Sequence, residues 1–255
     1  MKVLACLQPI RKLVLLVIFC QQLVIIAIAQ DTLRVGSTVL EGAIPPLGTW
    51  SVESFKIHQG VRTPINRSIV TIKQAAEEGV PVYAVSIIHS AVGRGDSALT
   101  TIVVRQKDFA LLRHKVKASH DSALVLFSQG FLSGWVVLPN KPVLLIDMKT
   151  PHPVFPVDGP APWLLSALPL KENFSVVIPR YSMWEMSEFY EEVRVVGTDT
   201  LERNGKRVEC WKVDNGPFAI PGYRAYRWVD KKTKGILQTV LRGKPEDPEY
   251  WSITE

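Results

Sequence analysis

The chain has 255 residues, of which 47% are hydrophobic and 21% are charged. This length permits one large β domain or two smaller ones, and the ordinary composition provides for a sizeable core. The formal net charge is +6, but three basic residues lie in an N-terminal segment that we expect to be removed. The remaining 27 Lys and Arg against 24 Asp and Glu leave about +3, which is too weak to suggest nucleic acid or an anionic lipid surface as a partner.

The first 29 residues resemble a secretory signal peptide. Lys2, Arg11 and Lys12 precede two apolar runs over residues 13–19 and 23–28, which Gln21-Gln22 interrupts, and Ala27-Ile28-Ala29 forms an A-x-A cleavage site. The alternative is a retained N-terminal membrane anchor, although a membrane span needs about 20 apolar residues. We therefore expect a periplasmic or secreted protein whose mature chain starts near residue 30.

The cysteines predict no internal disulfide. Cys6 and Cys20 belong to the signal segment, and Phe19 is too bulky for the position before a lipidated cysteine at Cys20. Cys210 is left alone beside Trp211. A single cysteine in a strand is typical of a small buried hydrophobic residue rather than a nucleophile.

The first half of the mature chain predicts antiparallel strands after an extended lead-in over residues 30–47. Branched residues dominate 98–105, where Thr100, Thr101, Ile102, Val103 and Val104 suit a pleated surface. The full set of expected strands here is 49–58, 67–74, 80–90, 98–105, 109–119 and 121–128.

A proline-rich region follows between Leu138 and Pro169. Proline lacks the backbone donor of a sheet ladder, so this region cannot be a continuous central sheet, although 141–147 suits one short strand. Within it, Pro162 to Leu168 predicts a short helix, because proline favours the first helical turn. The helix is apolar on nearly all sides, which indicates burial, and we expect it across the concave face of a curved sheet.

The last third predicts two consecutive β-hairpins. Asn204-Gly205 separates strands near 193–197 and 207–213, and this dipeptide favours a type I′ turn. A second hairpin joins 223–229 to 236–242, with Gly235 expected at a left-handed position. Between the helix and these hairpins, 174–178 predicts a short strand. Residues 182–196 could be helical from their methionine and aromatic residues, but their continuity with Val193 to Val196 favours a long strand. Residues 245–255 are expected to form a polar tail.

The second hairpin carries a resemblance. The run from Tyr226 to Leu237 is similar to the aromatic-β-Asp-x-x-Thr-x-Gly-apolar hairpin of the LolA/LolB-like superfamily. Val193 to Val213 resembles a stretch of the bacterial DUF3108 family. The resemblance implies an exported, mainly β protein with a strongly curved antiparallel half-barrel and a short plug helix. In the carrier members of the superfamily, the apolar concavity holds lipid acyl chains.

From the residues and this resemblance we predict a single domain over 30–255 with roughly nine to twelve strands. An apolar cavity is the usual small-molecule site, and large apolar side chains are the candidates to line it. The candidate ligand-binding residues are Trp135, Phe155, Trp163, Leu164, Leu168, Trp184, Trp211, Tyr226 and Trp228. The alternative is that these residues have a purely structural role and fill the core.

No motif indicates catalysis, a metal or a cofactor. The five histidines lack metal-ligand spacing, and no Gly-x-Ser-x-Gly elbow is present. His114 and His120 would share a strand face near Asp121, which is the one arrangement that could support an enzyme. The adjacent Glu191 and Glu192 should point to opposite faces.

The leading hypothesis is a non-catalytic cell-envelope protein, monomeric, that binds a lipid or other hydrophobic ligand, as in lipoprotein transport. The alternative is a structural or assembly factor without a ligand cavity, which would act through an envelope protein partner. A hydrolase is the weakest hypothesis.

Overall fold

The computed structural model describes residues 32–255 except 41, 94, 129, 151–152, 154, 157–160, 183–186 and 217–221. The expected signal peptide lies outside the described residues. No helix in the described part of the chain is long and apolar enough to cross a membrane.

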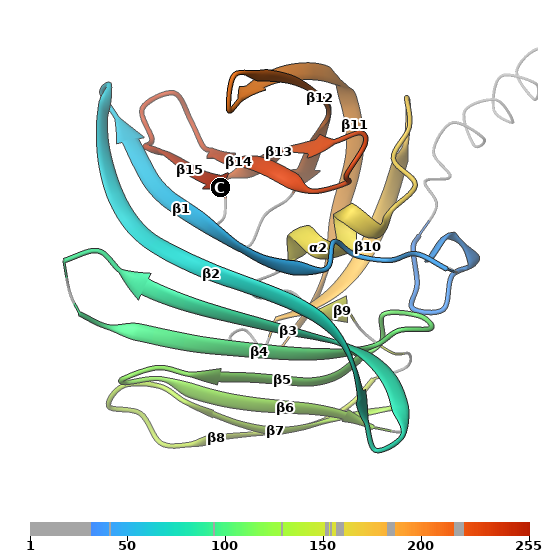
Figure 1. The fold of residues 1–255 in the computed structure, drawn as a ribbon. Coiled ribbons are helices and arrows are strands. Elements are labelled where there is room, and N and C mark those ends of the chain that lie inside the picture. The colour runs from blue at the N-terminus through green and yellow to red at the C-terminus, as the bar shows by residue number, and fades with distance from the viewer. Residues whose placement is uncertain are drawn as a thin grey trace, which may run out of the picture. The chain divides into compact units, whose positions relative to one another are not determined.

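In the part of the chain that the structure describes, fifteen strands form one sheet (Figure 1), so the fold is mainly β, as predicted, with more strands than expected. Its spatial order is β8-β7-β6-β5-β4-β3-β2-β1-β15-β14-β13-β12-β11-β10-β9, and neighbours are antiparallel except for the parallel pair β9 and β10. The strands are β1 Gly48–His58, β2 Val61–Glu77, β3 Val80–Ala91, β4 Ser97–Arg105, β5 Leu111–Lys117, β6 Ser122–Ser128, β7 Phe131–Val137, β8 Leu144–Lys149, β9 Phe155–Pro156, β10 Ser175–Ser182, β11 Ser187–Arg203, β12 Lys206–Gly216, β13 Arg224–Asp230, β14 Ile236–Arg242 and β15 Glu249–Thr254.

The C-terminal segment corrects the prediction of a polar tail over 245–255. It contains β15, which pairs with β1 on one side and with β14 on the other. β14 directly precedes β15 in the chain, but β1 is distant in sequence, so no local pattern indicates the pairing of β15 with β1. β15 is therefore the seam between the N-terminal and C-terminal strands of the sheet.

The lead-in also differs from the extended segment expected. Thr32 forms a bridge with Val177, and Thr38–Leu40 forms the 3-10 helix η2. Leu33 and Leu40 are buried in the main core. Their apolar side chains hold the segment against the domain.

The edges of the sheet follow from the prolines. β8 is one edge strand and the two-residue β9 is the other, and both lie in the proline-rich region. An edge strand forms ladder hydrogen bonds on one side only, so it can contain prolines, which lack the backbone N–H donor. The adjacent β7 was not predicted, since Gly134 interrupts its strand pattern. A Cβ at Gly134 would lie 1.9 Å from the Leu124 carbonyl oxygen, so only glycine fits there.

Alternation along the strands produces two faces. We define the inner face by side chains that join the helix in the main core cluster, such as Ile72, Ile102, Val125 and Val213. A second, smaller cluster around Cys210, Trp228 and Val240 covers the opposite, outer face of the C-terminal strands. Buried strand residues thus alternate between two apolar layers in this part of the sheet.

The predicted helix is present as α2, Ala161–Ala167, and lies on the concave side of the sheet (Figure 1). Leu164, Leu165 and Leu168 are 1–2% exposed and belong to the main core cluster. α2 is not part of the sheet ladder, so its side chains provide its attachment to the inner face.

Both predicted hairpins are present. Asn204 and Gly205 have φ values of 51° and 70°, as a type I′ turn requires. In the second hairpin the left-handed residue is Lys234, with φ of 60°, and not Gly235 as predicted. The Lys234 N–H donates to the Asp230 carbonyl oxygen at 2.9 Å, and this bond defines the turn.

Candidate functional site

Four polar side chains from adjacent strands are buried on the inner face. Arg180 comes from β10, Glu191 from β11, Asn215 from β12 and Arg227 from β13, and they are between 0% and 4% exposed. Cross-strand register places them among core residues: Glu191 is opposite Ile178, and Arg227 is opposite Val213. Strand alternation requires this placement, because each lies two residues from an inward apolar side chain. We call these four residues the inner polar cluster.

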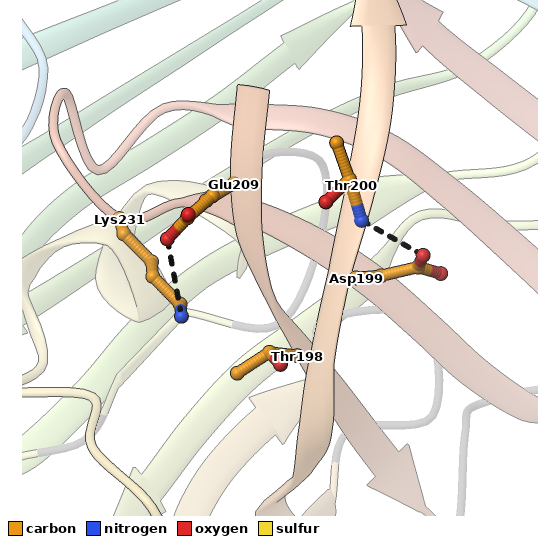
Figure 2. Close-up of a pocket in the computed structure, with 5 residues that line it drawn as sticks. All are labelled: Thr198, Asp199, Thr200, Glu209 and Lys231. Atoms are coloured by element: carbon orange, nitrogen blue, oxygen red, sulfur yellow. Dashed lines mark hydrogen bonds and ion pairs between the residues drawn. The ribbon is translucent and has the colours of Figure 1, made fainter. Parts of the chain in front are cut away.

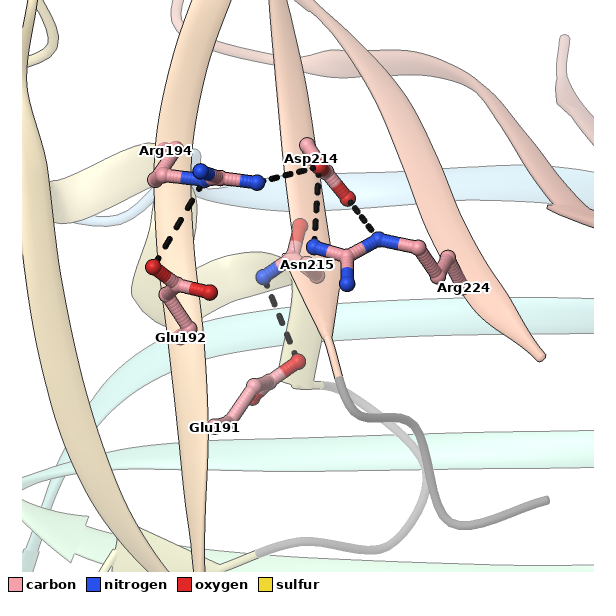
Figure 3. Close-up of polar contacts among 6 residues, drawn as sticks. All are labelled: Glu191, Glu192, Arg194, Asp214, Asn215 and Arg224. Carbon is pink, nitrogen blue, oxygen red and sulfur yellow. Dashed lines mark hydrogen bonds and ion pairs between the residues drawn. The ribbon is translucent and has the colours of Figure 1, made fainter. Parts of the chain in front are cut away.

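Glu191 is the centre of the inner polar cluster. Its Oε2 lies 3.0 Å from Arg180 Nη1, and its Oε1 lies 3.7 Å from Arg227 Nη1. Asn215 Nδ2 donates a hydrogen bond to Oε1 at 3.2 Å (Figure 3). One carboxylate therefore lies between two guanidinium groups, 3.0 Å from the first and 3.7 Å from the second.

Burial governs the electrostatics of this cluster. Removal from water lowers the pKa of Arg227 below its ordinary value, and the nearby Arg180 lowers it further, while Glu191 opposes both effects. Burying ions is costly, and replacing a buried ion pair by apolar residues is often neutral or stabilising. Burying the charges of the inner polar cluster in an apolar core therefore costs free energy. Buried groups with strongly shifted pKa values are enriched at functional sites.

The outer face carries a separate ionic network at the same level of the sheet. Asp214 pairs with Arg194 at 3.1 Å and with Arg224 at 2.9 Å, and Arg194 also lies 3.6 Å from Glu192 (Figure 3). The hydrogen bonds from Arg224 to Asp214 raise the pKa of that arginine. Glu191 and Glu192 therefore serve opposite faces, as predicted. Arg194 and Arg224 are 44% and 40% exposed, so solvent screens this network.

The structure divides the predicted cavity residues among three places. Phe155, Leu164 and Leu168 are buried in the main core cluster, and Trp211 packs against it from β12. Trp135 is half-buried. Side chains alternate along β7, and Leu132 and Val136 point to the inner face, so Trp135 lies on the outer face.

Tyr226 and Trp228 belong to the second cluster, on the outer face, with Trp228 in its core and Tyr226 packed against it. Strand alternation along β13 separates them from Val229, which joins the main cluster. The side chain of Trp163 and the whole of Trp184 lie outside the described residues. The structure thus brings together Phe155, Leu164, Leu168 and Trp211 from the predicted set.

The second cluster contains Cys210, whose side chain is fully buried. Burial, together with nearby Asp230 and Asp199, raises the pKa of the Cys210 thiol to about 11. The thiol is therefore protonated at neutral pH, which disfavours nucleophilic attack. This arrangement agrees with the interpretation of Cys210 as a packing residue.

A polar pocket of about 450 Å³ lies beside this cluster, lined by Thr198, Asp199, Thr200, Glu209 and Lys231 (Figure 2). Its charged groups already have partners. Lys231 Nζ lies 3.6 Å from Glu209 and 4.4 Å from the centre of the Trp211 ring. Trp228 Nε1 donates to Asp199 at 2.9 Å, and this bond is the largest cause of the lowered Asp199 pKa. The charged side chains that line the pocket are thus paired with other side chains of the protein.

The histidines do not form the arrangement that could support an enzyme. His114 is 2% exposed on the inner face, whereas His120 is exposed in the turn after β5. Burial lowers the pKa of His114 to about 3, so its ring is neutral. Among the described residues, no group of three or more His, Cys, Asp or Glu could hold a metal ion.

Sequence reasoning missed the inner polar cluster. Glu191 was considered only as half of an adjacent acidic pair, and Arg180 and Arg227 were not singled out. The available signal was the two-residue period of the strands, which places Glu191 with Val193 and Arg227 with Val229. The pairing of these residues depends on the order of four strands, which the sequence does not display.

The described domain is a curved antiparallel sheet with a short helix on its concave side and a buried polar cluster on its inner face. No family model matches the sequence, and no curated protein matches it. A solved structure of a DUF1329 family protein from Desulfovibrio piger is 11% identical to this chain, covers 81% of it and 82% of that chain, and has a TM-score of 0.27. A solved structure described as a "putative lipoprotein" from Parabacteroides distasonis is 8% identical, covers 83% of this chain and 96% of that chain, and has a TM-score of 0.32. Neither similarity defines a family for this chain.

Proposed function

We propose that this protein is a non-catalytic binding protein of the cell envelope that holds a lipid or other hydrophobic ligand on the concave side of its sheet. The observation that carries the proposal is the position of α2, a seven-residue helix whose leucines complete the apolar inner face without joining the sheet ladder. The expected signal segment supports an envelope location.

Energetic magnitudes support an exchange of α2 for a ligand. Burying each of Leu164, Leu165 and Leu168 contributes about 1.5–3 kcal/mol, whereas an acyl chain contributes about 0.8 kcal/mol for each buried methylene. A chain of about six to eleven carbons therefore matches the apolar burial of these three leucines. Because α2 leaves no ladder hydrogen bonds behind, its displacement keeps the sheet intact. α2 then acts as a plug that the ligand replaces.

The second candidate is a structural or assembly factor without a cavity. The observation that favours it is the burial of the α2 leucines, which are 1–2% exposed and fill space against the sheet. In that function α2 is a permanent part of the core.

The α2 variant Leu165→Ala distinguishes the two functions. Truncation weakens the docking of α2 and lowers protein stability by about 2–5 kcal/mol. If α2 is a plug, its displacement becomes easier, so we expect tighter binding of a neutral apolar fluorescent probe such as N-phenyl-1-naphthylamine. Fluorescence titration of the purified full chain measures the affinity, and urea unfolding measures the stability.

Leu132→Ala is the matched control, because Leu132 is equally buried in the same core cluster but belongs to strand β7. We expect a similar loss of stability with no gain in probe affinity. The wild-type protein should also retain hydrophobic ligand when purified from its own envelope, as native mass spectrometry detects. Absence of both ligand and probe binding would overturn the carrier function in favour of the structural one.

A further inference from the structure

The charged side chains of the sheet are distributed unevenly between its two halves. Strands β1 to β8 contain nine Lys and Arg but only three Asp and Glu, whereas β9 to β15 contain nine of each kind. The small net charge of the expected mature chain averages the two halves, so it does not indicate the basic one. We infer that the outer face of β2 to β8 binds the surface of an anionic phospholipid bilayer. This inference does not depend on the ligand proposed for the concave side.

Lysines without acidic partners mark the outer face of the basic half. Lys115 and Lys117 of β5 are exposed, and neither forms an ion pair within the part of the chain that the structure describes. They alternate with Val116, which belongs to the main core cluster, so both point outward. Of the three acidic residues in this half, Glu53 and Glu77 already pair with arginines at 2.6 Å and 2.9 Å. The two lysines therefore present uncompensated positive charge to the solvent.

Exposed aliphatic side chains lie beside these lysines on the same face. Cross-strand pairing places Ile69 opposite Ile88, Ile88 opposite Leu99, and Leu99 opposite Lys117. Residues directly opposite each other in an antiparallel pair share one face of the sheet. The three aliphatic side chains are 45%, 44% and 41% exposed. An apolar row across β2, β3 and β4 thus ends at a lysine of β5.

A second apolar row begins at the other lysine and runs to the edge of the sheet. Lys115 is opposite Leu124, Leu124 is opposite Trp135, and Trp135 is opposite Leu145. Leu145, on the edge strand β8, is 79% exposed. The lysines of β5 therefore lie between two rows of apolar side chains on one continuous face.

The residue types of this face favour a bilayer over a protein partner. Protein interfaces are enriched in aromatic residues and Arg and are depleted of Lys. At a lipid surface, aliphatic side chains enter the headgroup region, while lysine stems lie along apolar surface and their ammonium groups contact lipid phosphates. Because α2 lies on the concave side of the sheet (Figure 1), the outer face can contact a bilayer while the helix stays in place.

Cosedimentation of the purified full chain with lipid vesicles tests the inference. We expect vesicles of equal parts phosphatidylglycerol and phosphatidylcholine to bind the protein at least about tenfold more tightly than vesicles of phosphatidylcholine alone. This difference should disappear in about 1 M salt, where the screening length is about 3 Å. Absence of binding to the anionic vesicles would overturn the inference.

Charge reversal assigns the binding to this face. Lys115→Glu combined with Lys117→Glu should weaken binding to the anionic vesicles at least about tenfold. Lys206→Glu combined with Lys232→Glu is the matched control, because both residues are exposed in the C-terminal half and the net charge changes equally. We expect the control to change the affinity by at most about twofold, since distant charges are screened.

The N-terminal segment is present in every variant, so any binding that it causes is unaffected by these changes. Circular dichroism and the thermal midpoint check the fold of each variant. If the reversal of Lys115 and Lys117 prevents folding, Lys115→Gln combined with Lys117→Gln removes the same charges and should also weaken binding. Equal effects of the β5 variant and its control would overturn the assignment to this face.

Leu145→Ser separates a bilayer from a soluble acidic partner. Because Leu145 is largely exposed, we expect the variant to fold normally but to bind anionic vesicles about three- to fivefold more weakly, since it loses an apolar contact with lipid. Soluble poly-L-glutamate should bind the wild-type protein at least about tenfold more weakly than the vesicles at equal charge, because it offers no apolar phase. Equally tight binding of poly-L-glutamate, with no effect of Leu145→Ser on vesicle binding, would overturn the bilayer in favour of an acidic protein surface.

Discussion

At the scale of single residues, His114 links the inner face to pH. The side chain is 2% exposed and lies opposite Ile102 and Val125, and burial lowers its pKa from 6.5 to about 3. Between these values the unfolded chain binds a proton that the folded chain does not bind. His114 therefore does not reduce the free energy of unfolding above about pH 6.5. As the pH falls from 6.5 toward 3, its effect lowers the free energy of unfolding by about 1.4 kcal/mol for each pH unit.

Urea unfolding at pH 7 and pH 5 measures this effect. We expect the wild-type protein to lose about 2 kcal/mol between the two conditions from His114 alone, and we expect His114→Gln to remove that part of the loss. His120→Gln is the matched control, because His120 is exposed. His89, whose pKa is also lowered by burial, contributes equally to all three proteins. An unchanged pH dependence in His114→Gln would exclude His114 as its source.

At the scale of elements, Asp230 organises the turn between β13 and β14. Its Oδ1 accepts from the Lys232 N–H and its Oδ2 from Thr233 Oγ1, both at 2.7 Å, and its own N–H donates to the Gly235 carbonyl oxygen. The Asp-x-x-Thr-x-Gly spacing that carries the family resemblance is therefore explained by turn geometry. The motif determines how the hairpin closes and gives no information about a ligand.

Removal of this carboxylate tests the account of the turn. We expect Asp230→Ala to lower the free energy of unfolding by about 1–3 kcal/mol, because two donors lose their acceptor. Asp230→Asn keeps one acceptor oxygen and should recover part of the loss. Lys232→Ala, an exposed change in the same turn, is the control in urea unfolding. Equal stability of Asp230→Ala and Lys232→Ala would show that the turn does not depend on the carboxylate.

Elements with local causes could be predicted, and elements with distant causes could not. The Asn204-Gly205 hairpin and the proline-initiated helix depend on residues within one turn of one another, so the sequence predicts both. β15 pairs with the preceding strand β14 and also with the distant strand β1, and the pairing with β1 cannot be seen in the sequence of Glu249–Thr254 itself. The inner polar cluster has the same limitation, since Arg180 and Arg227 meet only through the order of their strands.

At the scale of the whole molecule, β15 joins the two halves of the sheet. Trp251 is opposite Phe55 on β1 and opposite Val240 on β14, and its ring stacks on Phe55 with centroids 6.2 Å apart. Beyond the strand, the Glu255 N–H donates to the Ser51 carbonyl oxygen at 2.9 Å. The outer face of the seam thus depends on one aromatic side chain that contacts both neighbours.

Trp251→Ala tests whether this seam couples the halves. Trp251 is half-buried, so we expect a loss of about 2–3 kcal/mol, below the range for a fully buried tryptophan. Trp135→Ala is the matched control, because Trp135 is also half-buried but lies on β7, next to the edge of the sheet. Urea unfolding followed by far-ultraviolet circular dichroism and by fluorescence measures both stability and cooperativity. If the seam couples the halves, Trp251→Ala lowers the stability more than Trp135→Ala does, and both probes report one coincident transition. Separate transitions in the wild-type protein would instead mean that the two halves unfold independently and that β15 is an ordinary strand of one of them.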